Sequence, residues 1–68
     1  MNATECKMKK LYRVTQCPKY EYLTIGAIYL CGSAGAMCIA LHRPHDGSGT
    51  YLSRNAAERV TLEEVQTA

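Results

Sequence analysis

Residues 22–41, YLTIGAIYLCGSAGAMCIAL, decide the fold because they form the most apolar part of the chain and carry no charged side chain. Two apolar runs, 23–30 and 37–41, flank the short segment 32–35, which has the sequence GSAG. Glycine adopts positive φ without steric penalty, so two apolar runs separated by such a segment predict a β-hairpin with its turn at 32–35. We expect this hairpin to supply the centre of the hydrophobic core.

Segments on both sides of the hairpin have the composition of strands. Residues 9–15, KKLYRVT, are rich in β-branched and aromatic side chains. Tyr12 and Val14 share one face of this strand, and Leu11 lies on the opposite face. Within the strand expected at 37–42, the odd-numbered residues should face the core and the even-numbered residues should face away from it.

The C-terminal third predicts a short strand, one helical turn and a last strand. The sequence RPHDGSG is a strong turn signal, and the strand TYLS at 50–53 follows it. Residues 54–59, RNAAER, favour one helical turn that Asn55 would cap. The segment 60–65, VTLEEV, alternates apolar and polar residues as a half-buried strand does. An amphipathic helix over 56–65 is the alternative, because Ala57, Val60, Thr61 and Glu64 also fall at helical spacing.

Five short strands, a long loop after the first strand, tight turns between the middle three and one helical turn before the last resemble the SH3-like small barrel. The resemblance covers residues 9–65, and the piece YLTIGAIYLC is similar to the second strand of that family, with its glycine after the first loop. It implies an all-β fold, a five-stranded SH3-like barrel with one short helical turn before the last strand. Residues 1–8 would be a flexible N-terminal tail and residues 66–68 a C-terminal tail. Many small chains of this pattern are accessory proteins of phages or mobile elements.

The size and the charge balance of the chain limit its function. Sixty-eight residues make one domain with a thin core, so a homodimer or a partner surface is a reasonable expectation. The net charge of +2 is small for a dedicated nucleic-acid-binding module. The apolar stretch 23–41 is uncharged, which keeps a membrane-spanning helix as an alternative, but glycines interrupt it. With no secretory signal visible, we expect a soluble, cytoplasmic protein without a membrane partner.

Four cysteines and two histidines are enough in number for a metal site, but their spacing does not fit one. The candidate ligands match no standard spacing, although two of them share a strand face: Cys31, Cys38, His42 and His45. We therefore expect no metal and no cofactor. Four cysteines also permit two disulfides with three pairings, and without a secretion signal we expect reduced thiols.

Tyrosines carry the binding hypothesis, because tyrosine offers apolar area with a polar tip and is favoured at interfaces. Tyr20 and Tyr22 lie in or beside the first long loop, which in SH3-like domains borders a ligand groove. The resemblance therefore implies a surface for a peptide or a protein. The expected partner-binding residues are Tyr12, Arg13, Lys19, Tyr20 and Tyr22.

A nucleic-acid-binding surface is the alternative, because basic side chains of the same region could contact phosphates while bases stack on tyrosines. The residues of that surface are Lys9, Lys10, Arg13 and Lys19. No paired carboxylates and no phosphate-binding glycine loop suggest catalysis. The sequence predicts a non-enzymatic protein-binding module, a phage-type small inhibitor or adaptor that acts on a larger host protein or nucleoprotein, with a small nucleic-acid-binding barrel as the alternative.

Overall fold

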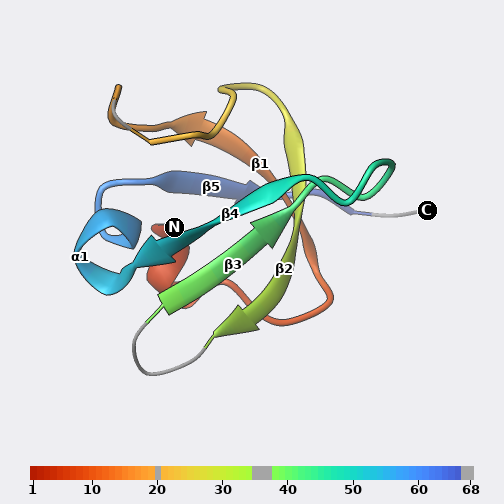
Figure 1. Cartoon of the computed structure of the whole chain (residues 1–68), viewed down its shortest axis with the longest axis horizontal. Helices are drawn as coiled ribbons and strands as arrows, with labels where there is room; N and C mark the ends of the chain where they lie inside the picture. The colour runs from red at the N-terminus through yellow and green to blue at the C-terminus, as the bar shows by residue number, and fades with distance from the viewer. Residues whose placement is uncertain (20, 35–37, 67–68) are drawn as a thin grey trace.

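One antiparallel sheet of five strands, in the order β4-β3-β2-β1-β5, forms this protein (Figure 1). The structure is a computed structural model that describes residues 1–19, 21–34 and 38–66. Its elements are η1 (Ala3–Glu5), β1 (Leu11–Gln16), β2 (Ile28–Ala34), β3 (Cys38–His42), β4 (Gly49–Ser53), α1 (Arg54–Ala57) and β5 (Thr61–Glu64). The expected all-β class, with a short helical piece before the last strand, is confirmed. Across the described ranges, no helix combines the length and the apolar character that crossing a membrane requires.

The central hairpin is confirmed, but the expected turn at 32–35 is wrong. β2 pairs antiparallel with β3, and it runs through Gly32 to Ala34 as a strand. The pairing register shifts on either side of Gly32, as it does at a β-bulge, where one strand carries an extra residue. Gly32 therefore marks an irregularity within β2 instead of a chain reversal. Residues 35–37 lie outside the described residues.

The core lies on one face of the sheet, to which the strands contribute alternate residues. Tyr12 and Val14 of β1 and Ile39 and Leu41 of β3 have no exposed surface, as their alternation predicts. Met37, expected on the same face, lies outside the described residues. Ala40 is also buried, although it belongs to the opposite face of β3. The other members of the core cluster are Ala3, Cys6, Tyr29, Cys31, Leu52, Ala57, Val60 and Leu62.

The helix α1 is one turn long and begins directly after β4. The side chain of Ser53 accepts a hydrogen bond of 3.2 Å from the backbone N–H of Ala56 and caps the helix. The expected cap, Asn55, lies inside the helix instead. Because Thr61–Glu64 is a strand, the alternative of one amphipathic helix over 56–65 is wrong.

The N-terminal segment, residues 1–7, packs against the sheet where a flexible tail over 1–8 was expected. Met1 donates from its N-terminus to the carbonyl of Leu62 (3.1 Å), and its own carbonyl accepts from the N–H of Leu62 (2.7 Å). Ala3 donates to the carbonyl just before β5 (2.9 Å), and both Ala3 and Cys6 are buried in the core. Hydrophobic periodicity misses such a segment because it is too short to repeat.

The sheet is not closed into the expected barrel. Closure would join the two edge strands, and β4 and β5 do not pair in the part of the chain that the structure describes. The N-terminal segment instead pairs with β5 through an isolated bridge between Asn2 and Thr61. At the end of the sheet, α1 lies between the ends of β4 and β5 (Figure 1). The outer edge of β5 is therefore covered at its start, at residues 60–62, by residues 1–3 of the chain.

Two tyrosines connect the core to irregular segments. Tyr12 and Tyr29 lie directly opposite each other on β1 and β2, and both are buried. The hydroxyl of Tyr12 accepts a hydrogen bond of 2.8 Å from the N–H of Lys7 in the N-terminal segment. The hydroxyl of Tyr29 accepts one of 3.0 Å from the N–H of Thr24 in the long loop between β1 and β2. Each ring thus fills the core and fastens one segment that has no strand of its own.

We expect Tyr12→Phe to destabilise the fold although the aromatic ring stays. The change leaves the Lys7 N–H without its acceptor, and the loss of one partly buried hydrogen bond lowers the free energy of unfolding by about 1 kcal/mol. Urea denaturation followed by circular dichroism measures this loss. Tyr22→Phe is the matched control because its ring is exposed, and it should change the free energy by less than about 0.5 kcal/mol. Equal stability of the two variants would show that the Tyr12 hydroxyl contributes nothing.

Gly49, at the start of β4, should be the glycine least tolerant of a side chain. A Cβ atom there would lie 2.0 Å from the carbonyl oxygen of Leu41 and 2.7 Å from the Cα of His42, both of which are backbone atoms. A Cβ at Gly32 would instead meet the side chain of His42 at 2.7 Å, and that ring can rotate away. We expect Gly49→Ala to lower the free energy of unfolding by about 3 kcal/mol and Gly32→Ala by about 1 kcal/mol. Chemical denaturation of both variants tests this order, and an equal loss would contradict it.

Candidate protein-binding surface

The structure separates the tyrosines that were expected to bind a partner. Tyr22 is 88% exposed, which is the highest exposed fraction among the large hydrophobic side chains that the structure describes at the surface. Tyr12 is fully buried, so its expected place in the binding surface is wrong: its alternation with Val14 puts it on the core face. Tyr20 lies outside the described residues. Of the expected tyrosines that the structure describes, only Tyr22 faces solvent.

The long loop between β1 and β2 is held in place by backbone and side-chain contacts. Its Gly26 N–H donates to the carbonyl of Val14 (2.7 Å), and the Val14 N–H donates to the carbonyl of Ala27 (3.1 Å). The hydroxyl of Tyr29 holds the loop from inside through Thr24. Three apolar residues of the loop turn inward and pack against the core, namely Cys17, Leu23 and Ala27.

Ile25 is the second large apolar side chain that this loop exposes, at 62%. The Ala27 N–H donates to the carbonyl of Thr24 (3.1 Å), which closes a turn with Ile25 and Gly26 at its two central positions. Gly26 has φ of 90°, as the third residue of a type II turn requires, so Ile25 occupies the projecting second position. Sequence reasoning did not select Ile25. The signal available for it was the glycine that follows it directly.

We define the loop surface as Lys19, Tyr22 and Ile25. All three side chains are exposed, and the Cα atoms of Tyr22 and Ile25 lie at most about 11 Å apart because only three chain steps separate them. The two large apolar groups can therefore contact one partner together.

The four basic residues of the alternative nucleic-acid surface do not form one patch. Lys19 follows the C-terminal end of β1, and Lys9 and Lys10 precede its N-terminal end, so that roughly 20 Å of strand lies between them. Arg13 lies in the middle of β1, and its guanidinium is 3.5 Å from the carboxylate of Glu63 on β5. An anion would therefore meet separated cations, one of which already has an acidic partner.

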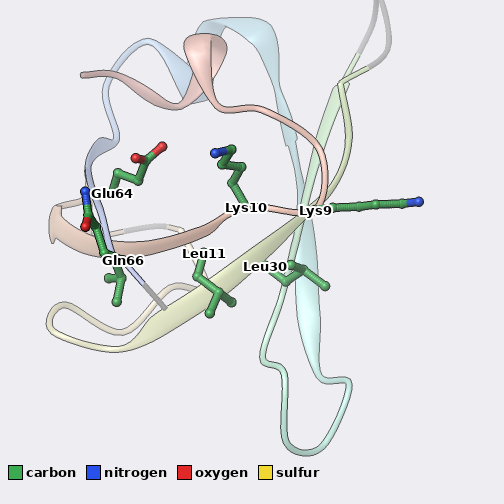
Figure 2. Close-up of a pocket in the computed structure, with 7 residues that line it drawn as sticks. Lys9, Lys10, Leu11, Leu30, Glu64 and Gln66 are labelled. Atoms are coloured by element: carbon green, nitrogen blue, oxygen red, sulfur yellow. The ribbon is translucent and has the colours of Figure 1, made fainter. Parts of the chain in front are cut away.

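A groove that sequence reasoning missed lies at the N-terminal end of β1. Its volume is about 470 Å³, and its lining consists of Lys9, Lys10, Leu11, Leu30, Glu64, Val65 and Gln66. Figure 2 shows Lys10 and Glu64 on one side of the β1 backbone and Leu11 and Leu30 on the other. The signal for it was Leu11, which alternation places on the face opposite the core. The groove combines a small apolar floor with charges of both signs, which select no particular ligand.

The sulfur and imidazole groups lie on both faces of the sheet. Cys6 and Cys31 meet in the core, where their Sγ atoms are 2.7 Å apart. Cys38 and His42 belong to the other face, and the His42 ring contacts the ring of Tyr51 edge to face, with 6.2 Å between centroids. The sheet thus separates Cys31 from Cys38 and His42, two of the other three candidate ligands. Among the residues that the structure describes, no three His, Cys, Asp or Glu side chains group closely enough to hold a metal ion.

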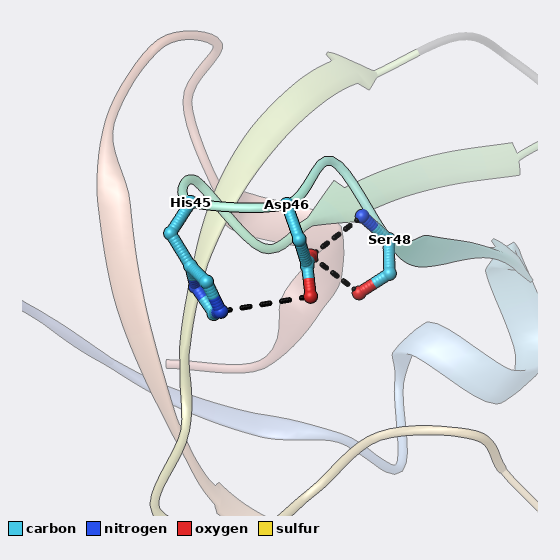
Figure 3. A network of polar contacts seen from close by, with 3 residues as sticks. All are labelled: His45, Asp46 and Ser48. Atoms are coloured by element: carbon cyan, nitrogen blue, oxygen red, sulfur yellow. Dashed lines mark hydrogen bonds and ion pairs between the residues drawn. The ribbon is translucent and has the colours of Figure 1, made fainter.

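The turn between β3 and β4 contains a small polar network around Asp46 (Figure 3). The Asp46 carboxylate accepts hydrogen bonds from the backbone N–H of Ser48 (2.9 Å) and from its hydroxyl (2.7 Å). The ring of His45 lies 3.6 Å from the other carboxylate oxygen. These contacts lower the pKa of Asp46, the Ser48 hydroxyl most of all. The network organises the turn, as the Asp-Gly signal indicates.

We expect Ser48→Ala to raise the pKa of Asp46 part of the way to the ordinary value of 3.8, because the hydroxyl is lost and the backbone donor stays. His45→Ala should raise it less, since the imidazolium contributes less than the hydroxyl. The depressed pKa means that Asp46 favours the folded state above pH 3.8, and that this contribution disappears as the pH falls through the lower folded value. NMR titration of the carboxyl carbon measures both variants. A larger rise for His45→Ala would contradict the assignment.

Comparison with known proteins assigns the chain to no family. No family model matches the sequence, and neither a curated protein nor a solved structure matches the chain. Its function is therefore inferred from the loop surface, the groove and the charges described above.

Proposed function

We propose that this protein is a non-enzymatic binding module that attaches to a larger protein through the loop surface. The observation that carries the proposal is the exposure of two large apolar side chains, Tyr22 and Ile25, on one loop whose residues 24–27 are hydrogen-bonded to one another and to β1. Three other apolar residues of the same loop, Cys17, Leu23 and Ala27, pack against the core. The loop therefore lies close enough to the core to bury side chains, and yet Tyr22 and Ile25 face the solvent. Large apolar side chains that a fixed backbone presents to water are typical of binding sites.

The energetics support a protein partner. Burying one large apolar side chain contributes roughly 1.5–3 kcal/mol, so two such anchors account for a substantial part of a micromolar affinity of about 8 kcal/mol. A loop that is already ordered loses little conformational entropy when it binds. Lys19 beside the anchors favours a partner with an acidic rim around an apolar pocket.

The SH3-like resemblance adds a role to this surface. In such domains the loop after the first strand borders the ligand groove, and here that loop carries Tyr22 and Ile25. The strand order and the one-turn helix before β5 agree with the element order that the resemblance rests on. A chain of this size would act as an inhibitor or adaptor that covers a site on its target. A phage-type origin of such an inhibitor stays a prediction.

The test compares the wild-type protein with the double variant Tyr22→Ala and Ile25→Ala in affinity capture from nuclease-treated lysate. A protein captured by the wild type at stoichiometric amount is then used to measure Kd. We expect the double variant to weaken this Kd roughly 100-fold or more, because each buried anchor contributes about 2 kcal/mol. Circular dichroism should be unchanged, since both side chains are exposed.

Tyr51→Ala is the matched control, because Tyr51 is also an exposed aromatic residue, at 68%, but lies on β4. It should bind the partner with the wild-type Kd. Retained binding by the loop double variant would overturn the proposal. Capture that disappears on nuclease treatment, and that falls steeply with salt and with Lys9→Glu and Lys10→Glu, would support the nucleic-acid alternative instead.

A further inference from the structure

Two cysteines that are 25 positions apart in the sequence meet in the core, and the backbone around them fixes their approach. The Lys9 N–H donates to the carbonyl of Cys31 (2.9 Å), and the Cys31 N–H donates to the carbonyl of Lys10 (3.1 Å). Between Cys6 and these contacts the chain turns back, with Lys9 at φ of 67° and a bond of 3.3 Å from the Lys10 N–H to the carbonyl of Lys7. This turn brings the Cys6 side chain over β2.

We propose that Cys6 and Cys31 are the two partners of an intramolecular disulfide, which joins the N-terminal segment covalently to β2. Their sulfur atoms are already 2.7 Å apart, and a disulfide needs about 2.05 Å, so the two atoms have to approach by only about 0.7 Å. Both residues are buried, and no other thiol competes at this place within the described residues. Four cysteines give six possible pairs, and the structure brings the sulfur atoms of this pair together.

The reaction is a thiol–disulfide exchange with an external disulfide, such as oxidised glutathione, as the oxidant. The thiolate of one cysteine attacks a glutathione sulfur, the glutathione S–S bond breaks, and one reduced glutathione leaves. The second cysteine then loses its proton and attacks the mixed disulfide, which forms the protein S–S bond and releases the second reduced glutathione. Two electrons pass to glutathione, and the two thiol protons leave with the products.

Access controls this reaction, because both thiols lie inside the folded protein. Burial, reinforced by the neighbouring Cys31 thiol, raises the pKa of Cys6 to about 12, so that few thiolates form in the closed state. The N-terminal segment is attached to β5 and to Tyr12 by only a few hydrogen bonds. The exchange therefore proceeds while this segment is detached, either during folding or in a local opening. Once formed, the bond is shielded from reductants by the same burial.

The test is disulfide mapping of the full chain after refolding in a buffer of reduced and oxidised glutathione. After free thiols are alkylated at low pH, cleavage at Lys and Arg combined with cleavage after Met places each of the four cysteines in a separate fragment. We expect mass spectrometry to find the Cys6 and Cys31 fragments joined, at a mass lower by two hydrogen atoms than their sum. Recovery of both fragments alkylated, or joined mainly to the fragments of Cys17 or Cys38, would overturn the proposal.

Variants separate this bond from general effects of cysteine loss. Cys17→Ser and Cys38→Ser should retain the cross-link, and Cys6→Ser should lose it. The oxidised wild type should melt roughly 10 °C higher than the reduced one, because the bond closes a loop of about 25 residues in the unfolded chain. This difference should vanish in Cys6→Ser. The disulfide mapping uses the wild-type protein, so it tests the Cys6–Cys31 bond even if a variant fails to fold. An unchanged melting temperature with the bond present would contradict its stabilising role.

Discussion

The pair of Tyr12 and Tyr29 is the contact on which the rest of the structure depends. The two rings lie opposite each other on neighbouring strands, and their hydroxyls accept hydrogen bonds from two separate segments, the N-terminal segment at Lys7 and the long loop at Thr24. A chain with neither Trp nor Phe has few ways to fill a core, and these rings are its largest buried side chains. Because a buried hydroxyl requires a partner, each ring also specifies where an irregular segment must run.

The N-terminal segment follows from this constraint. With Lys7 held by the Tyr12 hydroxyl, residues 1–3 pair with residues 60–62 at the start of β5, and Ala3 and Cys6 enter the core. The segment covers strand-edge groups of β5 that would otherwise stay open to another chain. At the start of β5 the segment occupies the edge with which β4 would have to pair in a closed barrel. A small domain gains a larger core in this way than its five strands alone would provide.

The sequence predicted the regular elements better than the surface. Alternation identified the core-facing residues of β1, β3 and β5, because a strand with one buried face repeats every second residue, but it missed the burial of Ala40 on the opposite face of β3. The tail expected at 1–8 and the turn expected at 32–35 were wrong for a shared reason, since neither feature produces a repeating pattern of apolar residues. The N-terminal segment pairs with β5 over only a few residues, and Gly32 is a single residue at a bulge. Alternation with Val14 already indicated a core position for Tyr12, whereas no period in the loop sequence marks Tyr22 as exposed. The exposed position of Ile25 and the meeting of Cys6 with Cys31 came only from the structure.

The same tyrosine pair connects the proposed function with the fold. The Tyr29 hydroxyl accepts a hydrogen bond from the N–H of Thr24, and the turn at Gly26 directs Ile25 outward. The backbone beside the exposed side chains of the loop surface is therefore held by the core. A loop that is ordered before binding matters for a small protein, because each residue that is immobilised on association reduces the binding free energy. A small protein has only a modest contact area to supply that free energy. A disulfide between Cys6 and Cys31 would fasten the segment held by Tyr12 and leave the segment held by Tyr29 unchanged. The Tyr12 hydroxyl thus holds the segment that the disulfide would fasten, and the Tyr29 hydroxyl holds the loop that presents the binding residues.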